Sequence, residues 1–131
     1  VAHNAGFDSR FLDAELAALG RERTNPMAGT MLAARRLFPE AANYKLATLG
    51  RHCGIRFDTF HRALADAEMT GHLWIAMTDL LKSHHGLLAT PFPLMQELTR
   101  MGRAKVGRHL QEVARQQRAN VPPTGSPLWI N

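Results

Sequence analysis

Cysteine is nearly absent from this sequence, since Cys53 is the only one among its 131 residues. A lone thiol forms no disulfide within its chain, which is typical of the reducing cytoplasm, and we expect a cytoplasmic protein. A catalytic thiol is the alternative role for Cys53, but its neighbours have the pattern of an ordinary amphipathic helix. Runs of about 18 apolar residues are also lacking, so the sequence predicts no membrane span. No basic-then-apolar secretory leader opens the chain.

The signatures of several enzyme classes are missing as well. The sequence contains no glycine-rich phosphate loop, which argues against a nucleotide-binding protein of that kind. It also shows no evident Ser/His/Asp arrangement, which argues against a serine hydrolase. His84 and His85 are adjacent, but no further ligand follows at metal-binding spacing.

Acidic residues are scarce toward the C-terminus. Residues 97–131 hold six Lys/Arg and only two Asp/Glu, whereas the preceding part is nearly neutral within a total net charge of +5. A polyanionic partner is compatible with this asymmetry. A solvated helix with spare arginines explains it almost as well.

Apolar residues recur at helical spacing through most of the chain. We expect helices at residues 4–19, 30–38 and 45–52, from about 59 or 61 to 82, and near 93–103 and 106–119. Residues 1–3 and 24–30 are candidates for short strands. The sequence therefore predicts a mostly helical chain with one or two short strands, and this alternation favours an α/β sheet over a helical bundle.

Asp66 and Asp8 are the carboxylates with the most informative positions. On a regular helix Ala63, Asp66, Ala67 and Thr70 share one face, which places Asp66 in an apolar stripe. A buried carboxylate needs a cation, a donor or a proton, so Asp66 is either a metal ligand or a structural residue bonded to backbone or arginine. Asp8 stands in the first turn of its helix, where a favourable interaction with the helix dipole is the alternative explanation.

His61 and Phe7 are the other candidates for a functional site. His61 falls at the entrance of the longest expected helix, and a neutral imidazole there suits a general base, although single histidines more often fill a surface or a core. Phe7 follows Gly6, which allows close approach of a ligand, and its ring could stack on a base.

Three segments together resemble a known family. Residues 1–12, VAHNAGFDSRFL, resemble the second motif of the DEDDh (DnaQ-like) exonucleases, hydrophobic-x-H-N-x-x-F-D-x-x-F-L, and residues 61–67, HRALADA, resemble the third, H-x-x-x-x-D-A. The segment between them is similar to the linking region of epsilon-type proofreading subunits of bacterial DNA polymerase III. The resemblance covers residues 1 to about 82, and the two motifs at this separation are specific as a pair.

The resemblance implies a ribonuclease H-like fold and an enzyme that removes nucleotides from DNA 3′ ends. By this resemblance Asp8 and Asp66 are ligands of two divalent ions, Mg²⁺ or Mn²⁺, and His61 deprotonates the attacking water. The substrate-binding residues would be His3, Asn4 and Phe7. The implied partners are a DNA 3′ end and a DNA polymerase subunit. Paired ions suit this reaction because they stabilise both the attacking and the leaving oxygen.

The first motif of that family, Asp-x-Glu, has no counterpart, because Glu15, Glu22 and Glu40 all follow the second motif. We therefore expect a truncated ribonuclease H-like fold. Residues 1–82 would be the C-terminal part of an exonuclease domain, 83–120 a basic helical extension and 121–131 a flexible tail. With two of four carboxylates, this piece alone is expected to be inactive. An open sheet edge where strands are missing would favour self-association.

Two other interpretations remain open from the sequence. The chain could be a non-catalytic module that binds nucleic acid or a polymerase, or a helical interaction domain whose histidines and aspartates are structural.

Overall fold

The computed structural model describes residues 1–56 and 62–122, and the regular structure within them is helical. Every helix that the apolar spacing predicted is present. The six helices are α1 (Ala5–Ala18), α2 (Thr30–Leu37), α3 (Leu46–His52), α4 (Arg62–Ser83), α5 (Phe92–Arg100) and α6 (Arg103–Ala119). Most of the expected flexible tail, and His61, lie outside the described residues.

The expected short strands are not formed in the described part of the chain. Residues near Ala2 and Gly29 do meet, but only as a single parallel bridge. The Ala2 N–H donates to the Ala28 carbonyl at 3.1 Å, and the Thr30 N–H donates to the Ala2 carbonyl at 3.0 Å. The pairing stops there because α1 begins at Ala5 and α2 at Thr30, so both segments leave the extended conformation.

The structure does not support the predicted self-association through an open sheet edge, because the strands that would form such an edge are not present in the described residues. A sheet edge recruits another chain through a row of unpaired backbone groups, and the described residues contain no strand to offer such a row.

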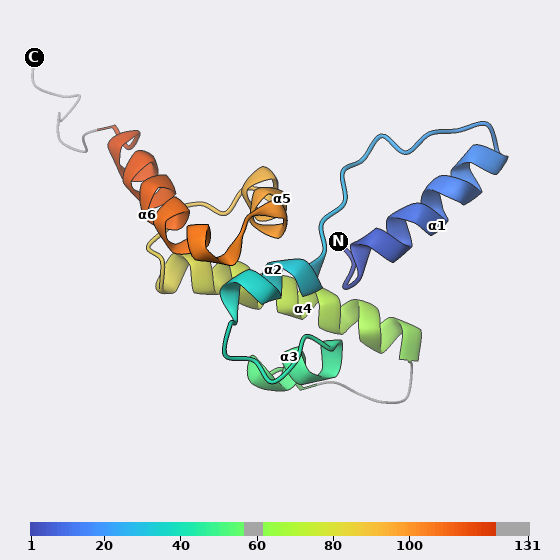
Figure 1. The fold of residues 1–131 in the computed structure, drawn as a ribbon, viewed down its shortest axis with the longest axis horizontal. Coiled ribbons are helices and arrows are strands. Elements are labelled where there is room, and N and C mark those ends of the chain that lie inside the picture. Colours follow the sequence, from blue (N-terminus) through green and yellow to red (C-terminus); the bar gives the residue numbers. More distant parts are fainter. Residues whose placement is uncertain (57–61, 123–131) are drawn as a thin grey trace, which may run out of the picture.

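Helix α2 is the centre of the packed part of the molecule. It contacts α4, α5 and α6, while α3 packs on α4 (Figure 1). The side chains that form this core are apolar and buried. They include Ala33, Ala34, Leu37, Phe38, Leu49, Leu73, Met77, Leu81, Leu87, Leu94, Met95, Leu98, Val106, Leu110 and Ala114. Within residues 1–56 and 62–122, no helix has both the length and the apolarity that a membrane crossing requires.

The C-terminal helices α5 and α6 share this core with the rest of the chain. Polar contacts fix them further, since the Arg36 side chain of α2 donates to the Met101 carbonyl at 3.0 Å. The Gln117 side chain of α6 accepts from the Leu88 N–H at 2.7 Å and donates to the Ala89 carbonyl at 2.8 Å. Within the region expected as a helical extension, α5 and α6 thus pack on α2, and α6 is also bonded to the connection between α4 and α5.

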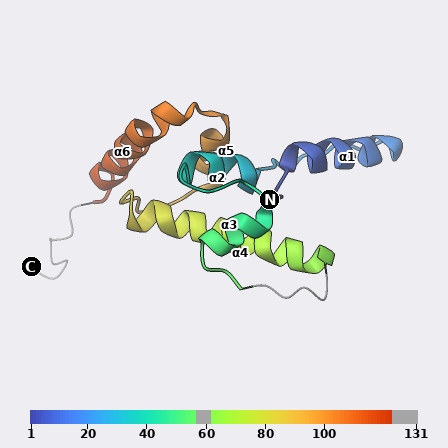
Figure 2. The same cartoon turned by 60° about the horizontal axis from the view of Figure 1, so that its bottom comes forward.

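Helix α1 extends away from this packed body (Figure 2). None of its side chains is buried, and Phe7 and Phe11 are 62% and 64% exposed. Its apolar residues recur as the sequence predicted, so the helix forms, but nothing in the described residues covers its apolar positions. An ion pair between Asp13 and Arg23, at 2.8 Å, ties the following loop back to α1.

A shared core makes a prediction for stability. Leu98 on α5 is fully buried, whereas Leu88 is 55% exposed. Replacing Leu98 with alanine should lower the free energy of unfolding by about 2–5 kcal/mol, because it leaves a cavity among α2, α5 and α6. The same change at Leu88 should cost less than about 0.5 kcal/mol. Urea denaturation of the chain, followed by circular dichroism, measures both, and equal small losses would contradict the shared core.

Candidate functional site

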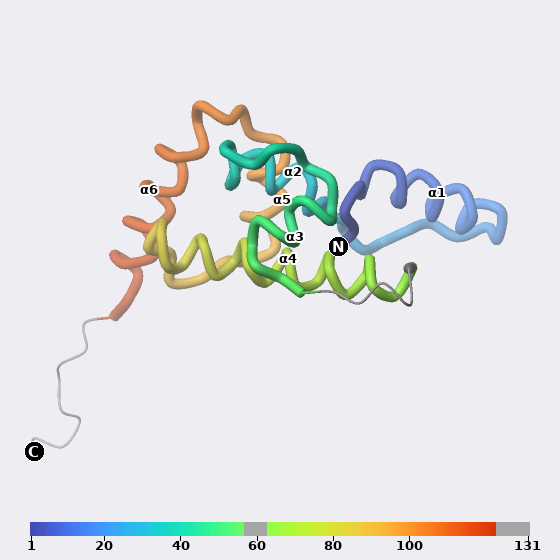
Figure 3. Tube along the Cα trace, turned by 90° about the horizontal axis from the view of Figure 1, so that it is seen from below, coloured from blue at the N-terminus to red at the C-terminus, as the bar shows by residue number. Residues whose placement is uncertain are grey.

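A pocket of about 570 Å³ brings the N-terminal segment together with α4. Figure 3 shows the chain start lying between α1 and the helices α3 and α4. The lining residues come from the N-terminal segment, the first turn of α1, the start of α3 and one face of α4. They are Val1, Ala2, His3, Asn4, Asp8, Leu46, Ala63, Asp66, Ala67, Thr70 and Gly71. Asp8 and Asp66, far apart in sequence, therefore border the same pocket.

Asp66 reaches this pocket from the face of α4 that the helical spacing predicted. Ala63, three positions before it, and Thr70, four positions after it, line the same pocket, because residues at these spacings share one face of a helix. The expected burial of Asp66 is wrong, because its residue is exposed and Met69 is the first buried residue described on α4. The cause is that the first turns of α4 project beyond the packed body (Figure 1). In the described part of the chain the Asp66 carboxylate has no ion-pair partner.

Asp8 enters the pocket from the first turn of α1, and its residue is exposed. The turn before it is held by the backbone of Asn4, whose carbonyl accepts from the N–H groups of Phe7 at 2.9 Å and Asp8 at 3.3 Å. The Asn4 side chain makes no capping bond, although its residue occupies the N-cap position. Among residues 1–56 and 62–122 its amide has no hydrogen-bond partner, and it lines the pocket with a donor and an acceptor.

His3 lines the pocket but has both ring nitrogens engaged. Nε2 lies 2.8 Å from the Tyr44 carbonyl, and Nδ1 lies 2.8 Å from the Thr30 hydroxyl. Since a carbonyl only accepts, Nε2 carries the proton, and the neutral ring accepts the Thr30 hydroxyl at Nδ1. Burial lowers the pKa of His3, against the opposing effects of the Tyr44 hydrogen bond and the charge of Asp66. The lowered pKa favours the neutral ring, and both of its nitrogens are already bonded within the protein.

The remaining predicted site residues are placed differently. Phe7 is 62% exposed on α1 and does not line the pocket. His61 lies outside the described residues and directly precedes Arg62, the first residue of α4.

The chemical type of the acidic side chains in this pocket suits a hard divalent cation. Carboxylate oxygens are the ligands that Mg²⁺ and Mn²⁺ prefer, and Asp8 and Asp66 both supply them. The number of such side chains, however, is too small for a complete metal site. Among residues 1–56 and 62–122, no group of three or more His, Cys, Asp or Glu side chains is placed to hold a metal ion. Two carboxylates are fewer ligands than a site for a divalent cation needs.

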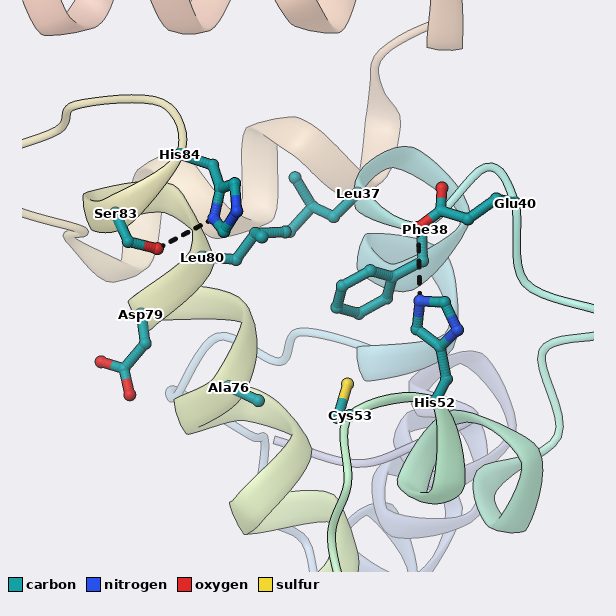
Figure 4. A pocket seen from close by; sticks show the side chains of 10 residues that line it. All are labelled: Leu37, Phe38, Glu40, His52, Cys53, Ala76, Asp79, Leu80, Ser83 and His84. Carbon is teal, nitrogen blue, oxygen red and sulfur yellow. Dashed lines mark hydrogen bonds and ion pairs between the residues drawn. The ribbon is translucent and has the colours of Figure 1, made fainter.

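A second pocket of about 460 Å³ lies between α2, α3 and the end of α4 (Figure 4). His52 approaches Glu40 at 3.3 Å on one side, and the Ser83 hydroxyl lies 3.0 Å from His84 on the other. Cys53 also lines this pocket, and burial raises the pKa of its thiol. A protonated thiol is a poor nucleophile, so this environment disfavours the catalytic role that the sequence left open for Cys53.

Sequence reasoning missed Thr30 and Tyr44, the two partners of the His3 ring. Thr30 is fully buried at the start of α2, and Tyr44 is half-buried in the loop before α3. No local pattern identifies them, because their contacts with His3 span 27 and 41 residues of chain.

Comparisons with known proteins match the part of the chain that contains this pocket. A model of the family described as Exonuclease matches residues 1–73. The C-terminal limit of this match falls within α4, so it includes Asp8 and Asp66 but not α5 or α6. No solved structure matches the chain.

The curated relatives are bacterial replication proteins named DNA polymerase III PolC-type. The chain is 42% identical to that of Bacillus cereus over 78 residues, which are 59% of this chain and 5% of the relative. It is 45% identical to that of Oceanobacillus iheyensis over 74 residues, and 38% identical to that of Clostridium perfringens over 73 residues, with 56% of this chain and 5% of the relative covered in each case. The chain thus spans about a twentieth of the length of these relatives.

Proposed function

Because this chain belongs to the exonuclease family, we propose that it forms the C-terminal part of a 3′-to-5′ exonuclease domain of the proofreading type. The substrate is a DNA 3′ end, and the partner is a DNA polymerase, as the names of the relatives suggest. The observation that carries this proposal is the meeting of Asp8 and Asp66, from the two motifs, at one pocket.

The reaction is hydrolysis of the last phosphodiester bond. Asp8 and Asp66 would hold divalent cations, Mg²⁺ or Mn²⁺, which when bound stabilise the attacking and leaving oxygens. His61 takes the proton of the attacking water, as a neutral imidazole can near neutral pH. Asn4 offers its amide, which lines the pocket, to the terminal nucleotide, and the exposed ring of Phe7 is available to stack on a base.

The two aspartates are too few for this chemistry alone. Two cations held close together repel each other, so several carboxylates are needed to keep both in place, and the described residues bring only two to this pocket. We therefore expect the remaining carboxylates, in an Asp-x-Glu strand, from another part of the gene product. The 131 residues by themselves should be inactive.

The test compares the complete gene product with this chain. Each is incubated with single-stranded DNA labelled at its 5′ end, and shortening from the 3′ end is followed with Mg²⁺, Mn²⁺ or a chelator. The complete product should remove nucleotides one at a time only when a metal is present. This chain alone should be slower by at least about three orders of magnitude, a loss equivalent to some 4 kcal/mol of transition-state stabilisation.

Two results would overturn parts of this proposal. DNA binding by the complete product without nucleotide release would favour a non-catalytic binding module. Fast release by the 131 residues with Mn²⁺ would show that the chain itself contains a sufficient metal site.

A further inference from the structure

The start of the chain is fastened to the N-terminus of α2 by four hydrogen bonds made by Ala2 and His3. Their carbonyls accept from the N–H groups of Thr30 and Met31, both at 3.0 Å, and the Ala2 N–H donates to Ala28. The fourth bond is that of the Thr30 hydroxyl to the His3 ring. First-turn N–H groups of a helix have no partner within the helix, so the N-terminal segment satisfies groups that α2 leaves open.

The second fixed point is the loop that carries Tyr44. The Tyr44 hydroxyl donates to the Phe38 carbonyl at 3.0 Å, and two guanidinium groups lie near its ring. Arg35 of α2 and Arg103 of α6 stand 5.7 and 5.6 Å from the ring centroid, within the range of cation–π attraction. The Tyr44 carbonyl that receives Nε2 of His3 is therefore part of a loop held from both α2 and α6.

Between these two points, His3 sets where the chain turns into α1. Asn4 follows it directly and supplies the carbonyl that holds the N–H of Asp8. Backbone bonds of Ala2 and His3 hold the segment as well, so loss of the ring bonds would loosen this turn and let Asp8 shift relative to Asp66 on α4. The Thr30 side chain makes one of these ring bonds without lining the pocket itself.

We propose that His3 is a positioning residue, clamped between Thr30 and the backbone of Tyr44, that fixes Asp8 opposite Asp66 for metal binding. It replaces the role of substrate contact expected for His3 from the sequence. The inference rests on the proposed exonuclease function. It also gives α6, which lies beyond the family match, a share in the site through Arg103 and Tyr44.

Thr30 offers a matched pair of variants for the test. Thr30→Val removes the hydroxyl and keeps the branched shape, while Thr30→Ser keeps the hydroxyl. In the complete gene product, Mn²⁺ affinity is measured from the electron paramagnetic resonance of free Mn²⁺, and kcat and KM are measured on single-stranded DNA. Thr30→Val should lower Mn²⁺ affinity and kcat by about 10- to 100-fold, the range for partners behind metal ligands, with KM within twofold. Thr30→Ser should restore both.

Two other outcomes would assign a different role to His3 or Thr30. A rise in KM with unchanged Mn²⁺ affinity would make His3 a substrate contact. A lower melting temperature with unchanged kcat and Mn²⁺ affinity would make Thr30 purely structural. Either result overturns the inference, while nucleotide release by the wild type keeps the proposed function.

The geometry of the clamp has a readout that needs no activity. Long-range ¹H–¹⁵N spectra of the chain with labelled histidine report which nitrogen of His3 carries the proton. We expect the Nε2–H form in the wild type and in Thr30→Ser, and a mixture in Thr30→Val. An Nδ1–H form in the wild type would overturn the clamp. If the wild-type gene product neither binds Mn²⁺ nor releases nucleotides, the proposed function fails, and the positioning role fails with it even where the spectra match.

Discussion

Replacing Asp66 with asparagine in the complete gene product is expected to lower the exonuclease rate by about three orders of magnitude. Asparagine has nearly the same size and keeps one oxygen, so the change removes charge and leaves the fold of α4 intact. Asp66 is exposed and has no ion-pair partner in the described chain, and its loss should therefore cost little stability. The measurement is the initial rate of 3′ nucleotide release at saturating Mg²⁺, with a thermal melt of each variant.

Glu68 provides the control for this prediction. It is an exposed acid on the same helix but does not line the pocket, so Glu68→Gln should leave the rate within twofold. Asp8→Asn should match Asp66→Asn, and the double variant should be little slower than either single one, because residues that act as a unit are not additive. Two independent, multiplying effects of Asp8 and Asp66 would contradict a shared metal site.

Loss of the imidazole at position 61 is the other large expected effect. His61→Ala in the complete gene product should slow nucleotide release by about 10²- to 10⁴-fold, the usual contribution of a general base. The wild-type rate should fall as the pH is lowered through the range in which histidine gains a proton, since a protonated ring accepts nothing. The variant should lose this dependence, because the group that titrates is gone. A pH–rate profile of both proteins measures it.

His72 is the matched control for His61. It is an exposed histidine on α4 that lines neither described pocket, so His72→Ala should leave both rate and pH profile unchanged. Mn²⁺ affinity separates the roles further, since a general base is not a metal ligand and His61→Ala should leave that affinity intact. A full rate in His61→Ala would remove His61 from the mechanism.

The helices were predictable because the signal for a helix is local. Apolar residues three and four apart marked α2 and α4 to within a few positions, and Gly20, with a φ of 67°, follows α1 as a glycine beyond a helix end should. The strands failed because a strand depends on its partners. Residues 1–3 and 24–30 had suitable composition, but helices that begin at Ala5 and Thr30 leave room for one bridge only.

Burial was the least predictable property, because it depends on what covers a face. The apolar spacing that made Asp66 a buried carboxylate is real, yet only the later turns of α4 are covered by α2 and α3. The same reasoning applies to α1, whose apolar positions are regular but exposed. The apolar residues of α5 and α6 are buried in the core, although the charge of residues 97–131 by itself left a solvated helix as one interpretation.

By itself, the sequence determined the helices and the family, and it identified Asp8 and Asp66 as candidate site residues, because short-range spacing and motif identity encode all three. Only the tertiary structure decided that Asp8 and Asp66 share a pocket with Asn4, and that His3 is bonded at both nitrogens. The physical reason is that these contacts join segments distant along the chain. The packing of whole helices decides which side chains meet across such distances. The spacing of residues within one helix carries no information on that packing.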